Sequence, residues 1–167
     1  MKYHGVTING ATAGLTLCVS AVFVVLFVTG CLLTPSMLEF RLCWDVIWRL
    51  AGDDRVWVVA AHVLAGFAML ALLGVLWARH MRSGWKMKRN RLSGAVFLSV
   101  WAILTVTGVG ILYLGGETVS IGASVVHTAL GLLVPAFLGV HVWAGLRSRR
   151  MTRVFRATPL PDRAPAE

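Results

Sequence analysis

Residues 121–146 read IGASVVHTALGLLVPAFLGVHVWAGL, a run with no charged side chain and with two histidines, His127 and His141. A helix needs about 20 predominantly apolar residues to cross the hydrocarbon core of a bilayer. Three more runs of this kind lie at about 10–33, 56–78 and 92–114. The sequence therefore predicts an all-α membrane protein, with a bundle of four transmembrane helices within residues 1–150.

The composition of the whole chain agrees with this prediction. Of its 167 residues, 57% are hydrophobic and 14% charged, and the mean hydropathy is +0.76. Soluble domains are about 45–50% apolar and about 25% charged. A water-soluble globule of this size could not bury so much apolar surface, so soluble enzyme folds and extensive disorder are both excluded.

Basic residues are distributed unevenly between the connecting segments. Residues 79–91 contain six and no acid, the segment after residue 146 contains six arginines, and residues 34–55 contain three. Lys and Arg accumulate in the cytoplasmic segments of membrane proteins. With both termini inside, thirteen basic residues are cytoplasmic and three are not, which predicts an N-in, C-in orientation. The net charge of +9 then reflects topology, and no nucleic-acid partner is expected.

Two segments outside the spans carry further predictions. Apolar residues recur at helical spacing between about 36 and 51, which predicts a short amphipathic helix in the outer interface. This helix is either a simple membrane cap or a docking surface for a partner. Residues 151–167 are basic and then Pro-rich, and we expect a disordered cytoplasmic tail.

Histidines within the spans occur only in the second and fourth: His62 and His80, then His127 and His141. Ionisable side chains inside a bilayer are costly and usually functional. At 3.6 residues per turn, both histidines of each helix fall on one face, and the two on the fourth span lie about 21 Å apart along its axis. Facing stripes would form two layers of paired imidazoles, as a pair of stacked bis-His haems requires. We therefore predict these four histidines as metal ligands.

The partner of His141 is the least determined ligand. His80 lies about one turn, roughly 6 Å, deeper than the ideal position. It either ligates the inner haem through helix tilt or serves a quinone or proton site at the inner surface. His4 is a fallback ligand. Met69 and Met81 could offer thioethers, although ordinary packing explains them better.

Glycines of the odd-numbered spans lie at the levels of the two layers. Gly108 and Gly30 match the outer layer, and Gly94 matches the inner layer. A glycine provides clearance where a porphyrin edge meets a helix, but small residues also serve helix packing in membranes. Val28-Thr29-Gly30 is echoed by Val106-Thr107-Gly108, so the chain resembles two helical hairpins of similar design.

Arginines near the ends of the spans are candidates for binding haem propionates. Arg79, Arg82 and Arg147 lie near the inner layer, and Arg55 lies near the outer one. Ordinary flanking of membrane spans by basic residues explains all four equally well.

Three stretches together resemble a known family: His62-Val-Leu-Ala-Gly66 through Arg79, Leu104 through Tyr113, and Val126-His127 through His141-Val-Trp143. They are similar to the four-helix di-haem cytochrome b subunits that anchor formate dehydrogenase, nickel–iron hydrogenase and thiosulfate reductase, and to bacterial cytochrome b561-like proteins. The resemblance covers about residues 56–146. It implies b-type haems, exchange of electrons with quinone or quinol, and a partner redox protein on the periplasmic face of a bacterial inner membrane.

The resemblance also implies individual ligands. His62 and His127 match those of the outer haem, and His141 matches one ligand of the inner haem. The family usually takes the other inner ligand from the first span, where this chain has no histidine near Thr16. Either His80 or His4 substitutes, or the inner haem is absent.

We therefore expect a membrane-anchored electron-transfer subunit of a larger oxidoreductase, with one or two haems that carry the redox chemistry. The alternative is a non-haem structural or assembly tetraspan whose histidines bridge helices by hydrogen bonds. A small transporter that relays protons through its histidines is a third possibility.

Overall fold

Each of the four apolar runs forms one long helix. The computed structural model describes residues 5–86 and 91–157, and the regular secondary structure in these ranges is entirely helical. In chain order the elements are α1 (Gly5–Leu42), α2 (Gly52–Leu76), the π-helical η1 (Trp77–Met81), α3 (Arg82–Lys86), α4 (Arg91–Tyr113) and α5 (Glu117–Ala157). Four helices are long and apolar enough to cross a membrane, within Ala13–Leu42, Gly52–Leu76, Arg91–Tyr113 and Glu117–Ser148. The prediction of an all-helical chain with four potential spans is confirmed.

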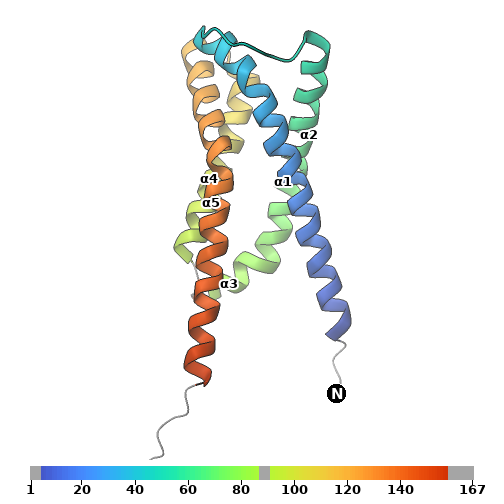
Figure 1. The fold of residues 1–167 in the computed structure, drawn as a ribbon, viewed down its shortest axis with the longest axis vertical. Helices are drawn as coiled ribbons and strands as arrows, with labels where there is room; N and C mark the ends of the chain where they lie inside the picture. Colours follow the sequence, from blue (N-terminus) through green and yellow to red (C-terminus); the bar gives the residue numbers. More distant parts are fainter. Residues whose placement is uncertain (1–4, 87–90, 158–167) are drawn as a thin grey trace, which may run out of the picture.

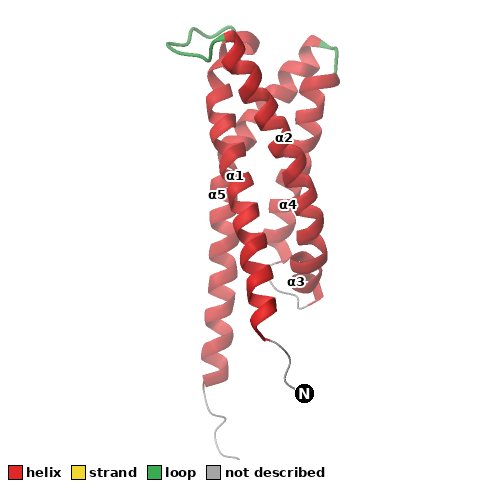
Figure 2. Cartoon of the chain, turned by 90° about the vertical axis from the view of Figure 1, so that its right-hand side faces the viewer, coloured by secondary structure: helices red, strands yellow, loops and turns green. Residues whose placement is uncertain are grey.

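The helices associate as two hairpins. α1 packs on α2, α4 packs on α5, and α1 also packs on α5, which joins the hairpins. Figures 1 and 2 show an elongated bundle. The connections α1–α2 and α4–α5 lie at one end, here called the loop end, and the start of α1 and the end of α5 lie towards the other, the terminal end.

The apolar core lies mainly between α4 and α5. Val100 and Leu104 of α4 and Val134 of α5 are buried together, and larger side chains pack around them: Phe23, Phe97, Trp101, Leu130 and Phe137. On α2, Met69 is only 2% exposed. Most other apolar side chains point outward, as expected for helices surrounded by lipid.

The predicted amphipathic helix at about 36–51 is wrong. Residues 36–42 are the last turns of α1, and residues 43–51 contain no helix. The break occurs at Cys43, whose φ of 54° is left-handed. The Trp44 N–H donates to the Leu38 carbonyl at 3.2 Å, so the chain after Cys43 is hydrogen-bonded back to the last turns of α1. Glycine usually occupies a left-handed position at the end of a helix. Because residue 43 is a cysteine, the sequence did not predict that α1 ends there.

The loop that follows is anchored to the end of α1. Arg49 pairs with Glu39 at 2.9 Å. The guanidinium groups of Arg49 and Arg55 lie 4.9 and 5.0 Å from the ring centre of Phe40. Arg55, a candidate propionate ligand from the sequence, is therefore engaged at the loop end.

The tail prediction is also wrong in part. α5 continues to Ala157, so residues 151–157 are helical, and residues 158–167 lie outside the described ranges. The segment after Leu146 contains no Gly or Pro up to Ala157, and Arg and Met are good helix formers. Net charge alone therefore did not end the helix.

Candidate functional site

Two pairs of histidines face each other between α2–η1 and α5. The rings of His62 and His127 have centroids 6.1 Å apart with an interplanar angle of 73°. The rings of His80 and His141 have centroids 6.3 Å apart with an angle of 75°. We call His62 and His127 the loop-side pair and His80 and His141 the terminal-side pair. The structure thus brings together the four histidines that the sequence singled out, in the two predicted layers.

The approach of His80 to His141 depends on a local change of helix type. His80 belongs to η1, where the chain leaves the α-helical geometry of α2. A π-helical turn bonds i to i+5 and therefore holds more residues than an α-helical turn. In Figure 1 the chain from the lower part of α2 through α3 swings across towards α5. His80 lies opposite His141 at the end of this segment.

The hydrogen bonds of His62 assign its tautomer. Its Nδ1 lies 2.8 Å from Thr29 Oγ1, and the Thr29 hydroxyl donates to the Val25 carbonyl at 2.6 Å. Because a hydroxyl has one proton, Thr29 accepts from the imidazole, and Nδ1 carries the hydrogen. The other nitrogen, Nε2, keeps its lone pair and is available to a metal.

His127 is held in the same way by α4. Its Nδ1 lies 3.1 Å from Thr107 Oγ1 and 3.0 Å from the Leu104 carbonyl oxygen. The Thr107 hydroxyl donates to the Ile103 carbonyl at 2.7 Å. A carbonyl can only accept, so Nδ1 of His127 is the protonated nitrogen and Nε2 is again free to act as a ligand.

The terminal-side pair is held more loosely. Nδ1 of His141 lies 3.4 Å from Ser93 Oγ, and the ring stacks on Phe97 with centroids 5.6 Å apart and an angle of 11°. His80 is exposed. The two pairs therefore offer the same ligand chemistry with different support.

The three glycines predicted to line the site each lie against a histidine. A Cβ on Gly108 would come within 3.2 Å of His127 Cε1, whereas on Gly30 it would be 3.5 Å from His62 Cε1. On Gly94 it would be 3.7 Å from His141 Cε1. Of these three contacts, only the one at Gly108 is closer than ordinary van der Waals contact, so Gly108 makes room for the His127 ring.

Sequence reasoning missed the hydroxyl residue before each glycine. Thr29-Gly30, Thr107-Gly108 and Ser93-Gly94 each present a hydroxyl to Nδ1 and an open backbone to Cε1 of one histidine. The Val-Thr-Gly repeat is visible in the sequence, where it indicates a repeat of the fold and does not by itself assign a role to its threonines. The sequence therefore contained the repeated threonines, but their contacts with the histidines became visible only in the structure.

The basic candidates and the fallback ligands are placed less closely. Arg82 is exposed at the start of α3, and only the backbone of Arg79 is described. The Arg147 guanidinium lies 5.4 Å from the ring centre of Trp143. Met69 belongs to the buried core, and His4 lies outside the described residues.

Each pair offers two imidazoles that would be able to hold one haem iron between them. An imidazole nitrogen lies about 2.0–2.1 Å from a bound transition metal such as zinc. The ring centre is about 1 Å further, so two imidazoles on opposite sides of one metal ion have centres about 6 Å apart. Both pairs meet this spacing. Within the described residues no third His, Cys, Asp or Glu joins either pair, and haem iron takes its remaining ligands from the porphyrin.

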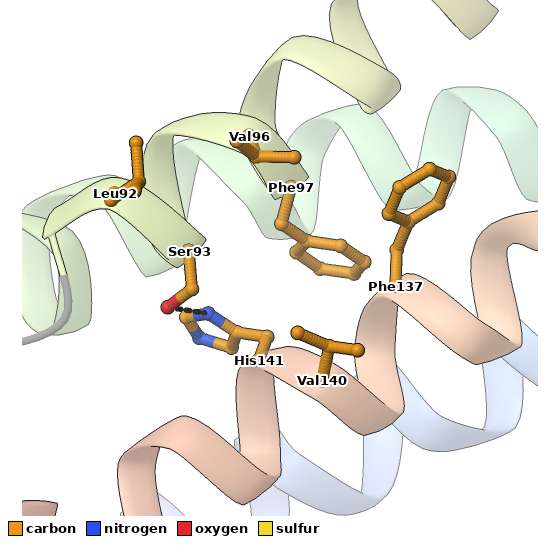
Figure 3. Close-up of a pocket in the computed structure, with 7 residues that line it drawn as sticks. All are labelled: Leu92, Ser93, Val96, Phe97, Phe137, Val140 and His141. Atoms are coloured by element: carbon orange, nitrogen blue, oxygen red, sulfur yellow. Dashed lines mark hydrogen bonds between the residues drawn. The ribbon is translucent and has the colours of Figure 1, made fainter.

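A groove of about 240 Å³ lies beside the terminal-side pair (Figure 3). Its lining is apolar except for Ser93 and His141 and comes from α4 and α5: Leu92, Ser93, Val96, Phe97, Phe137, Val140 and His141. Figure 3 shows Ser93 and His141 bonded to each other on one side of the groove, with Phe97 and Phe137 on another.

Comparisons of the chain with protein families, with curated proteins and with solved structures give no match.

Proposed function

We propose that this chain is a membrane-embedded b-type cytochrome subunit. It would transfer electrons between the quinone pool and a partner redox protein through bis-His haems, one at each histidine pair. The observation that carries this proposal is the pairing of four imidazoles at 6.1 and 6.3 Å on α2–η1 and α5. The hydrogen bonds that leave Nε2 of His62 and His127 free support it.

In this proposal His62 and His127 hold one haem, and His80 and His141 hold the other. A bound haem supplies one-electron chemistry, because its iron cycles between the ferric and ferrous states. The chain's own residues orient the imidazoles and exclude water from between the helices. Along α5 the two ligand positions are 14 residues, or about 21 Å, apart, so the pairs divide the thickness of the bilayer between them.

The groove beside His141 is the proposed site of quinone exchange. Its apolar walls suit a lipid-soluble ring and tail. Ser93 supplies a polar group at this groove for a quinone carbonyl, whereas His141 is assigned to the haem. The groove also adjoins one ligand of the terminal-side pair, so a bound ring would lie next to a redox centre.

The charge distribution supports an orientation. Residues 79–91 and the segment after Leu146 carry twelve of the sixteen Lys and Arg residues, and η1, α3 and the last turns of α5 lie towards the terminal end. By the positive-inside rule this end is cytoplasmic. The loop end would then face the periplasm of a bacterial inner membrane, where the partner redox protein would bind.

The non-haem alternative uses the same hydrogen bonds. In a structural tetraspan, Thr29 and Thr107 would bond to His62 and His127 only to bridge neighbouring helices. The 6 Å approach of the rings across α2 and α5 favours the cytochrome, because helix bridging to threonine does not require the opposed rings to come together.

A reduced-minus-oxidised visible spectrum tests the proposal. The protein is produced with sufficient haem supply, purified in detergent and treated with a short-chain quinol. We expect a b-type spectrum that appears on addition of quinol. A preparation that binds haem but is not reduced by quinol would contradict the quinone assignment, and a haem-free folded protein would support the structural tetraspan.

A further inference from the structure

Two threonines hold the loop-side pair from opposite sides of the bundle. Thr29 on α1 reaches His62 on α2, and Thr107 on α4 reaches His127 on α5. Each hydroxyl donates to the carbonyl four residues earlier and accepts the Nδ1 hydrogen of the histidine. The two contacts therefore correspond, one in each hairpin, and Nδ1 of His127 also lies 3.0 Å from the Leu104 carbonyl oxygen.

Two other threonines of α1 and α4 make the backbone hydrogen bond that is common for threonine in helices, without the contact to an imidazole. Thr34 donates to the Gly30 carbonyl at 2.9 Å, and Thr105 donates to the Trp101 carbonyl at 2.8 Å. Within the described part of the chain these two hydroxyls bond to no histidine. The backbone bond is thus a common feature of threonine in these helices, and acceptance from an imidazole is specific to Thr29 and Thr107.

A hydrogen bond from Nδ1 of a histidine affects how its other nitrogen binds a metal. A hydrogen bond from Nδ1–H fixes the ring orientation and the tautomer and raises the basicity of the coordinating nitrogen. A more basic ligand stabilises ferric relative to ferrous iron. Loss of such a bond should therefore raise the midpoint potential of the bound haem and weaken its attachment.

We propose that Thr29 and Thr107 are positioning residues that set the ligand orientation and the midpoint potential of the loop-side haem. This inference rests on the proposed function. In the terminal-side pair, Ser93 Oγ lies 3.4 Å from Nδ1 of His141, a longer contact than either threonine bond, so the two haems should differ in their response to loss of the threonine hydroxyl.

The test compares Thr29→Val and Thr107→Val with the matched controls Thr34→Val and Thr105→Val. All four substitutions preserve side-chain shape and remove one hydroxyl, and only the first two remove an imidazole partner. We expect the first two to shift the midpoint potential of one haem upward in a redox titration and to lower its affinity by about tenfold. The second haem, and both haems of the controls, should titrate as in the wild type.

A second pair of variants guards against effects on folding. Thr29→Ser and Thr107→Ser retain the hydroxyl and should restore the wild-type potential, with helix content checked by circular dichroism. Valine variants that bind haem and titrate like their controls would overturn the positioning role and leave the cytochrome proposal intact. Equal haem loss in all four valine variants would also overturn it. A wild-type protein without haem would overturn both proposals.

Discussion

The loop-side and terminal-side pairs contain the same two imidazoles at nearly the same separation, 6.1 and 6.3 Å, but their surroundings differ. His62 and His127 lie in regular α-helix, and each is bonded at Nδ1 by a threonine. His80 lies exposed in a π-helical turn, and His141 has a longer contact to Ser93. The loop-side pair thus has shorter hydrogen bonds to its imidazoles than the terminal-side pair, which adjoins the apolar groove.

The largest expected effect comes from removing one proposed ligand of the loop-side pair. His127→Ala should abolish the loop-side haem and retain the terminal-side one, because no other described imidazole lies opposite His62. Haem and protein assays of the purified variant should give half the wild-type ratio. Retention of the full ratio would mean that His62 and His127 do not bind the same haem.

The terminal-side pair is tested by comparing the two candidate partners of His141, which are His80 and His4. His80→Ala should abolish the terminal-side haem, whereas His4→Ala should retain both, since His80 is the residue that faces His141. Haem content measures the outcome. The opposite pattern would assign the ligand to His4 and leave η1 without a role in the site.

A smaller effect is expected from filling the groove. Val96→Trp should slow reduction by quinol about tenfold, equal to about 1.4 kcal/mol of lost binding, without loss of haem. Val106→Trp is the control, because Val106 is also exposed on α4 and does not line the groove. Stopped-flow reduction measures the rate. Equal rates in both variants would place quinone elsewhere.

The smallest effect comes from the glycines. Gly108→Ala places a methyl group 3.2 Å from His127 Cε1, while Gly94→Ala leaves 3.7 Å to His141. Overpacking costs about 1 kcal/mol at its lower end, so Gly108→Ala should reduce loop-side haem affinity about fivefold. Gly94→Ala, and Gly131→Ala with no neighbour within 4 Å, should match the wild type. Haem titration of the apoprotein measures all three.

The features that the sequence predicted are those that depend on a regular spacing of residues along a helix or on the high cost of placing polar groups in a bilayer. Charge-free runs predicted four long helices because a bilayer forbids anything else of that length. The spacing of His127 and His141 predicted one stripe because α5 stays helical through Pro135. These signals are carried by residue types alone.

The parts that the sequence did not reveal depend on backbone conformations without a residue signature. The residue types of Trp77–Met81 do not predict a π-helical turn, and the 18-residue spacing alone did not predict that His80 lies opposite His141. Cys43 ends α1 in a left-handed conformation that glycine usually adopts. The roles of Thr29 and Thr107 could not be predicted from the sequence, because they depend on which residue of the neighbouring helix lies opposite each threonine. Thr34 and Thr105 make the same kind of backbone hydrogen bond as Thr29 and Thr107.

The central claim is that each histidine pair binds one haem, and the haem-to-protein ratio tests it most directly. A pyridine haemochrome assay on the purified wild-type chain, combined with quantitative amino-acid analysis, gives this ratio. The account predicts two b-type haems per chain, falling to one in His127→Ala and to one in His80→Ala. A folded wild-type chain that binds no haem under haem-replete expression would contradict it.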